Sequence, residues 1–267
     1  LALRNDDIDY IAWSVPPVFV QELANEPGVA LQQSPQPGFF YLAYNMRRQS
    51  FGYDDSGNDT GKPLRRAITH CIDKETIVQR ILLNFGIAGK GPVSSLSEWF
   101  NDSIPRYNYD PEKAKRILAD AGYKVKQGDI LLSAEEAVAA AGYDYSTSDG
   151  PNYWVNPDGT EIGSGPDGVI EILAPEANYD PSKKQTTPAI MIAAQLRDIG
   201  IYAEAVVMDF GSILAMIGTD PYTTPEDHDF DMYTLGWRIS SKPAEYLYNL
   251  FHSSQADNGH NYPGYQN

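Results

Sequence analysis

Residues 169–208 read VIEILAPEANYDPSKKQTTPAIMIAAQLRDIGIYAEAVVM, and this stretch decides the fold. It opens with an apolar, β-rich run that ends at Pro175, which is typical of a strand. Residues 187–200 carry apolar side chains at helical spacing and stop at Gly200, which predicts an amphipathic helix. Residues 202–208 return to a strand pattern. A strand, a helix and a strand at this spacing predict an α/β domain with at least some parallel pairing.

The same pattern continues toward the C-terminus. Asp209 is placed to cap a short helix over residues 209–218, and residues 230–235 alternate as a half-buried strand. Gly236, Trp237 and a polar turn follow that strand. In α/β proteins, strand ends and the loops after them gather ligand contacts, so Trp237 and Arg238 are candidate ligand residues. On these residues alone, a tryptophan that simply packs against the edge of the core remains the alternative.

The segment between residues 63 and 142 predicts helices. Its first apolar pattern breaks at Asp73, which we expect to cap the second of two helices. Asp110 caps a helix that Gly122 ends, with Pro111 at its first position. Residues 133–142 repeat this pattern, with Ser133 as the expected cap.

The remaining segments carry weaker signals. A short helix is predicted to close near residues 27–28, and the aromatic run at residues 38–45 predicts a strand. Residues 143–168 are rich in Gly, Pro, Asp and Asn. They indicate loops around one short strand at residues 153–155. A helix is expected at residues 243–251.

Composition excludes several classes of function. The chain has 267 residues and a net charge of −16, which argues against nucleic acid or an anionic membrane surface as a partner. The single cysteine, Cys71, cannot form an intramolecular disulfide and is expected to be a buried, inert thiol. The chain opens on Leu1 in the middle of a pattern, so we expect it to be an excised piece of a longer protein.

Motifs of covalent chemistry are absent from the sequence. It contains no phosphate loop, no GxGxxG after a strand, no GxSxG and no HExxH. His252 and His260 are not favoured as a metal pair, because further ligands would have to come from elsewhere. Asp229 and Asp231 are expected to share a solvent-exposed face of the strand. We therefore predict no catalytic residues, no metal and no cofactor. A secreted hydrolase that uses a carboxylate pair is kept as an alternative.

Five stretches, in order along the chain, resemble the family 5 extracellular solute-binding proteins of ABC importers. They are NDDIDYIAW with FFYLAYN, then RRAITHCIDKETIVQRILLNFGIAGKGPV, then YNYDPEKAKRILADAGY, then DFDMYTLGW followed by Pro243, and finally LFHSS with NYPGYQN. The likeness covers essentially the whole chain. Each match is weak by itself, and their shared order carries the resemblance.

The resemblance implies a fold and a domain organisation. Members of this family have two lobes that enclose a ligand. Residues 1–267 are then a single α/β lobe, a truncated piece of such a protein that corresponds mostly to its second, C-terminal lobe. The expected architecture is that of a periplasmic-binding-protein-like (type II) lobe, with a mixed β-sheet flanked by helices. Residues 1–38 would be the hinge-approach segment, and residues 39–267 the ligand-facing lobe.

The resemblance also implies a function. We expect a non-enzymatic receptor, extracellular or periplasmic and membrane-anchored in its full-length form, that binds a small solute as a monomer. It would deliver this solute, an oligopeptide in the favoured interpretation, to a membrane permease. An oligosaccharide or a nickel chelate are the alternatives within the family.

Site residues follow from the same resemblance. In peptide-binding relatives an aspartate three residues past the tryptophan receives the peptide's α-amino group, and this chain has Ser240 at that position. Arg238 could instead hold a carboxylate, with solvent exposure as the alternative. The candidate ligand residues are Trp237, Arg238 and Ser240, followed by Tyr44 and Asn45.

Overall fold

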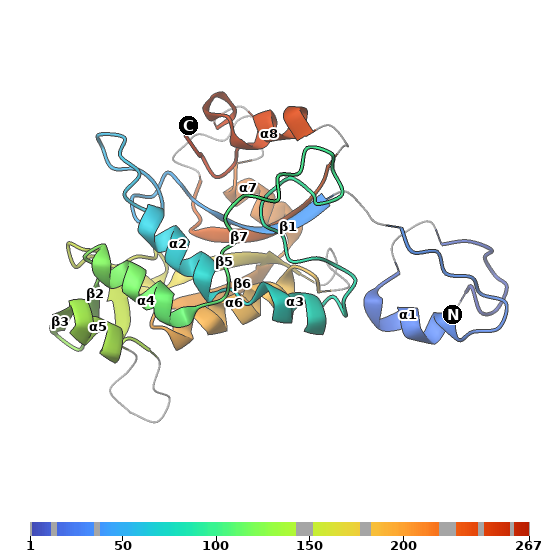
Figure 1. The fold of residues 1–267 in the computed structure, drawn as a ribbon, viewed down its shortest axis with the longest axis horizontal. Coiled ribbons are helices and arrows are strands. Elements are labelled where there is room, and N and C mark those ends of the chain that lie inside the picture. The colour runs from blue at the N-terminus through green and yellow to red at the C-terminus, as the bar shows by residue number, and fades with distance from the viewer. Residues whose placement is uncertain are drawn as a thin grey trace.

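A mixed four-stranded sheet forms the centre of the chain (Figure 1). The computed structural model describes residues 2–11, 15–34, 38–142, 152–176, 183–218, 228–239, 243–256 and 259–266. The strand order in the sheet is β1-β7-β5-β6. These strands are β1 (Gly38–Tyr44), β5 (Ile170–Pro175), β6 (Ala203–Met208) and β7 (Met232–Arg238). Strand β5 pairs in parallel with β6 and β7, while β1 runs antiparallel to β7. The predicted mixed α/β sheet is confirmed.

Helices cover both faces of this sheet (Figure 1). Helix α6 (Thr186–Asp198) connects β5 to β6 and packs with α2 (Lys62–Cys71) on one face, where Ile172 and Met232 are buried. Helix α7 (Phe210–Met216) connects β6 to β7 and covers the other face, where Leu173 and Tyr233 are buried. Alternate residues along β5 and β7 therefore enter two separate cores, because side chains alternate across a strand.

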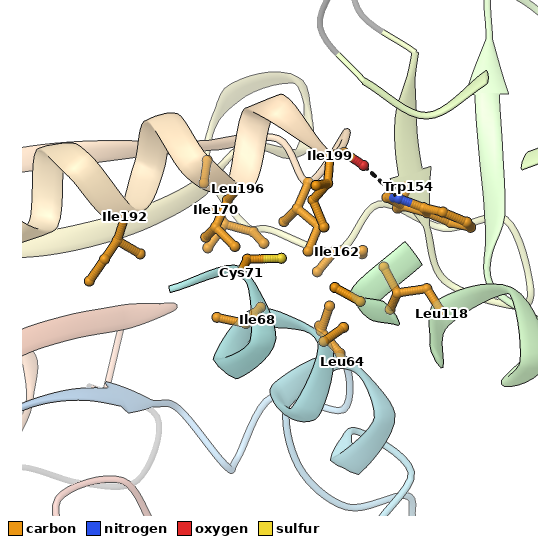
Figure 2. Close-up of a cluster of buried hydrophobic side chains, with 14 of the residues drawn as sticks. Leu64, Ile68, Cys71, Leu118, Trp154, Ile162, Ile170, Ile192, Leu196 and Ile199 are labelled. Atoms are coloured by element: carbon orange, nitrogen blue, oxygen red, sulfur yellow. Dashed lines mark hydrogen bonds between the residues drawn. The ribbon is translucent and has the colours of Figure 1, made fainter. Parts of the chain in front are cut away.

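The main core joins the sheet to the helical part of the chain (Figure 2). Leu64, Ile68 and Cys71 from α2 meet Ile192 and Leu196 from α6 there. Burial raises the pKa of the Cys71 thiol, so the thiol stays protonated, which agrees with the inert role predicted from sequence.

A second sheet of three short strands has the order β3-β2-β4. These strands are β2 (Lys124–Gln127), β3 (Ile130–Ser133) and β4 (Tyr153–Val155). Only β4 was predicted. Trp154 on β4 is 1% exposed, and its Nε1 donates to the Ile199 carbonyl at 2.9 Å (Figure 2). This bond ties the second sheet to the turn between α6 and β6. Gly200 in that turn has a φ of +84°, a left-handed conformation that glycine adopts without steric cost.

The remaining helices begin largely where the sequence predicts. They are α1 (Pro17–Ala24), α3 (Lys74–Arg80), α4 (Pro111–Asp120), α5 (Ala134–Ala140) and α8 (Pro243–Phe251). Asp73, Asp110 and Asp209 accept bonds from backbone N–H groups in the first turns of α3, α4 and α7, as expected. In the described part of the chain, no helix is long and apolar enough to cross a membrane.

Two local predictions need correction. Ser133 makes no capping bond to α5, since the helix starts from Ala134 with a φ of +54° and Ser133 itself ends strand β3. The predicted strand at residues 230–235 starts later, at Met232, and continues through Trp237 and Arg238, because β1 supplies partners for both. Gly236 and Trp237, which we expected to follow the strand, therefore belong to it, and the polar turn expected after Trp237 falls mostly outside the described residues.

Candidate functional site

The topology indicates that a ligand binds at one end of the strands of the main sheet. Helix α6 leaves β5 along one face, and α7 brings the chain back to β7 on the other side of β5 along the opposite face. The two strands that follow β5 in sequence therefore lie on opposite sides of it, and the direction in which strands are added reverses between β5 and β7. Ligands of open α/β sheets bind outside the carboxyl ends of the strands at such a reversal. Those ends are Pro175 on β5 and Arg238 on β7, and we call this end of the sheet the carboxyl edge.

Trp237 lies at the carboxyl edge, but its indole is engaged within the protein. Its Nε1 donates to the Tyr41 hydroxyl at 3.0 Å, and the Tyr41 hydroxyl lies 3.4 Å from that of Tyr233. Tyr262 stacks on the indole at 6.3 Å between ring centroids, and His260 meets it edge-on at 5.6 Å. The half-buried indole thus packs under the C-terminal segment.

Tyr41 and Tyr233, which are linked by hydrogen bonds to the Trp237 indole, stay protonated. Burial raises the pKa of Tyr41 to about 12, while its hydrogen bonds with Tyr233 and Trp237 act in the opposite direction. Burial also raises the pKa of Tyr233 well above its ordinary value. Both hydroxyls therefore remain able to donate hydrogen bonds at physiological pH.

The four sequence-predicted residues that the structure describes do not come together. Trp237 and Arg238 pair with Phe39 and Gly38 at one end of β1, whereas Tyr44 pairs with Met232 at the other end. The two positions are five residue steps apart along the strand, which corresponds to roughly 16 Å at 3.3 Å per residue. Arg238 is exposed at the carboxyl edge. Ser240 lies outside the described residues.

Tyr44 and Asn45 make contacts within the protein at this far end. Burial raises the pKa of Tyr44 to about 12, a shift that a hydrogen bond with Thr69 partly offsets. Asn45 is 1% exposed, and its Nδ2 donates to the carbonyls of His228 and Phe230, each at 2.9 Å. Its amide therefore fastens the end of β1 to the residues that precede β7.

The expected solvent exposure of Asp231 is wrong. Asp229 is exposed, as predicted, but Asp231 is fully buried, because the chain enters β7 only at Met232 and the alternation does not extend back to it. The Asp231 carboxylate accepts from the backbone N–H groups of Ser164 and Glu171 at 3.0 and 3.1 Å and from the Ser164 hydroxyl at 3.0 Å.

An arginine completes this network. Arg48 Nε lies 3.3 Å from Asp231 and donates to the Phe230 carbonyl at 2.8 Å, and another guanidinium nitrogen donates to Asp229 at 2.8 Å. The network fastens β1, β5 and β7 together at the amino ends of β5 and β7, opposite the carboxyl edge. We therefore assign it a structural role.

Glu171, beside this network, gives a pH-dependent prediction. Its pKa is raised by burial first, and then by the negative charges of Asp231, Glu204 and Asp229. A raised pKa in the folded state favours the protonated form, so this stabilising contribution is present at acidic pH and is lost as pH rises through the folded-state pKa. Glu171→Gln should therefore raise the free energy of unfolding at pH 7, by less than about 1 kcal/mol because the group is largely solvated.

Urea denaturation of both proteins at neutral pH and at about pH 4, near the pKa of a free glutamate, measures this difference. The gain of Glu171→Gln should shrink toward the acidic end. A gain that grows as the pH falls would contradict the assignment.

The described residues contain no cluster of His, Cys, Asp or Glu that could hold a metal ion. The Asp54 carboxylate accepts from the backbone N–H groups of Ser56 and Asn58 in its own loop. His252 bonds to Ser254 at the start of a short 3₁₀ turn. The loop that begins at Asp54 and the histidine at position 252 therefore make local structural contacts.

Comparison with known proteins identifies relatives along the chain. Residues 1–259 match the family described as bacterial extracellular solute-binding proteins, family 5 Middle. The oligopeptide-binding protein AppA of Bacillus subtilis is 26% identical over 231 residues, which are 86% of this chain and 34% of that protein. The dipeptide-binding protein of Escherichia coli is 22% identical over 247 residues, which are 92% of this chain and 36% of that protein.

The heme-binding protein A of Haemophilus influenzae is 32% identical over 102 residues, which are 38% of this chain and 17% of that protein. Each of these relatives is named as a binding protein and none as an enzyme. The chain spans about a third of the length of AppA and of the dipeptide-binding protein.

A solved structure shares the fold. The structure of Bacillus subtilis AppA in complex with a nonapeptide superimposes with a TM-score of 0.70 and 24% identity, and the match covers 100% of this chain and 43% of that one. The arrangement of sheet and helices is therefore that of a known binding protein.

Proposed function

Because this chain belongs to the family 5 bacterial extracellular solute-binding proteins, we propose that it is part of the substrate-binding component of an ABC importer that captures peptides. The family match over residues 1–259 is the observation that carries the proposal. The peptide as ligand class is supported by AppA, which is named as an oligopeptide-binding protein and whose structure holds a nonapeptide. Capture takes place outside the cytoplasm, and a membrane permease receives the peptide.

The proposed mechanism is non-covalent. Residues 1–38 approach a hinge, and residues 39–267 form one of two lobes that close on the ligand. Affinity then arises from contacts that exist only in the closed state, and these contacts bias the hinge equilibrium. The carboxyl edge of the main sheet is the part of this lobe that we assign to the ligand.

The candidate residues take different roles in this proposal. Arg238 and Ser240 contact the ligand, and Arg238 holds a carboxylate of the peptide. Trp237 supports the carboxyl edge by packing, since its ring contacts Tyr41 and Tyr262 and not the ligand in this proposal. Tyr44 and Asn45 hold the far end of β1.

Arg238→Ala is expected to weaken peptide binding about ten- to a hundredfold, because hydrogen bonds to charged groups contribute about 1.5–3 kcal/mol. Isothermal titration of the full-length protein measures this loss, which should be larger for a peptide with a free C-terminal carboxylate than for its amidated form. Arg80→Ala, which removes another exposed arginine on α3, is the matched control. Equal losses for the free and amidated peptides would contradict the carboxylate role.

The ligand itself is tested on the full-length protein, purified without denaturation and then unfolded to release what it carries. Mass spectrometry should find a mixture of short peptides. A sugar or a nickel chelate would keep the importer and replace the substrate class. A released molecule that the protein had cleaved would instead point to a hydrolase.

A further inference from the structure

Phe40 exposes a large aromatic ring at the carboxyl edge. It lies on β1 directly opposite Gly236 of β7, on the sheet face that α2 and α6 cover farther along. Its side chain is 52% exposed. Exposed apolar residues are common on protein surfaces, so exposure alone assigns no role.

The neighbouring glycine explains how the ring is held. A Cβ atom added at Gly236 would lie 2.7 Å from Cδ1 and 2.8 Å from Cε1 of Phe40. The ring therefore lies across the bare backbone of β7, an arrangement in which an aromatic side chain covers a glycine on the neighbouring strand. Because the inner side of the ring rests on backbone, its outer side faces solvent as a flat apolar shelf.

Other aromatic rings of the two strands are engaged in packing. Trp237 bonds to Tyr41 and stacks on Tyr262 on the opposite face, and Phe39 packs against the cluster around α8. Tyr44 lies at the far end of β1. Within the described residues of β1 and β7, the other aromatic side chains are buried or half-buried, and Phe40 is exposed.

Two cross-strand pairs adjoin the ring on this face, and one of them, Gly38 with Arg238, carries the exposed guanidinium that we assign to the peptide carboxylate. The other pair is Leu42 with Thr234, and Thr234 is 5% exposed. A ligand group that reaches the shelf would meet the aromatic ring and the glycine backbone, with the buried Thr234 on one side and Arg238 on the other. The ring and the glycine backbone favour an uncharged apolar group, because a charge placed over them would lose hydration. A carboxylate of the same ligand would instead lie toward Arg238, two residues farther along β7.

We propose that the shelf formed by Phe40 over Gly236 selects the ligand by stacking with a flat or branched apolar side chain of the bound peptide. The inference rests on the proposed peptide-binding function and names the class of peptide preferred. It also moves the aromatic contact from Trp237 to Phe40, on the other face of the same sheet edge. The stacking geometry is offset or edge-to-face, as is usual for aromatic pairs.

The test uses the full-length protein and a synthetic random-sequence peptide library, with mass spectrometry of the captured peptides. The wild-type protein should enrich peptides with an aromatic or branched apolar residue at one position. Phe40→Ala should lose this enrichment and bind the enriched peptides about five- to tenfold more weakly, as expected for the loss of an aromatic contact. Phe40→Tyr should retain the enrichment.

Two further variants separate the shelf from a general effect of mutation. Gly236→Ala keeps the phenyl ring but displaces it, so it should also reduce the enrichment. Ile130→Ala removes a side chain that is 60% exposed on the second sheet and should change nothing. Circular dichroism and thermal melts confirm that each variant is folded.

Each outcome decides one question. Full enrichment in Phe40→Ala, or loss of enrichment in Trp237→Phe alone, would overturn the assignment to Phe40 while leaving peptide binding in place. Capture of no peptide by the wild-type protein, whose folding the melts establish, would overturn the peptide function and the shelf with it.

Discussion

Asp231→Asn is expected to lower the free energy of unfolding by about 3 kcal/mol. The wild-type carboxylate is fully buried, accepts three hydrogen bonds and lies beside the guanidinium of Arg48, whose side chain is 28% exposed. An asparagine amide can direct its oxygen at the backbone N–H groups of Ser164 and Glu171, but the NH₂ group then faces the arginine. The arginine then loses its buried charged partner and keeps only the exposed Asp229, and removing one member of a pair at a buried position is strongly destabilising.

Urea denaturation followed by circular dichroism measures this loss. Asp229→Asn is the matched control, because Asp229 bonds to the same arginine but its side chain is 82% exposed. The control should change the free energy of unfolding by less than about 1 kcal/mol, as is usual for exposed ion pairs. Equal effects of the two substitutions would show that burial of Asp231 does not set its contribution.

Trp154→Ala is expected to lower the free energy of unfolding by about 3–5 kcal/mol, the usual range for removing a large aromatic side chain from a core. The indole fills the space between the second sheet and the helices of the main core, as Figure 2 shows. Trp154→Phe should cost less, because it keeps an aromatic ring and leaves only the Ile199 carbonyl without its side-chain donor.

Thermal and urea unfolding compare both variants with Trp99→Ala. Trp99 is 65% exposed, so its removal should change the stability by about 0.5 kcal/mol or less. If Trp154→Ala proved as mild as Trp99→Ala, the second sheet would not depend on this contact with the main core.

Local sequence signals located most helices, because capping is a short-range interaction. Asp73, Asp110 and Asp209 each bond to a backbone N–H group within three residues, so neighbouring residues alone predict them. The hairpin of β2 and β3 was missed because its strands have four residues each and lie between two helix signals. Strands of this length carry little periodicity.

The site depends on contacts that sequence spacing does not reveal. Continuation of β7 through Trp237 required a partner strand about two hundred positions earlier in the chain. Burial of Asp231 required the N–H groups of the turn before β5 and the start of that strand, which no local pattern connects to it. The exposure of Phe40 follows from the glycine across the sheet. Once the register of β1 and β7 was known, the alignment of an aromatic residue with a glycine could have predicted that Phe40 covers Gly236.

The pairing of β1 with β7 also affects how this chain is made. Gly38 pairs with Arg238, so 200 residues of synthesis separate the edge strand from its partner. At a translation rate of roughly 5–20 residues per second, β7 leaves the ribosome roughly 10–40 s after the aromatic run FFY of β1. Pairings this distant in sequence also form slowly. The nascent chain therefore exposes an unpaired aromatic strand during translation, and chaperone capture in that interval would protect it from aggregation.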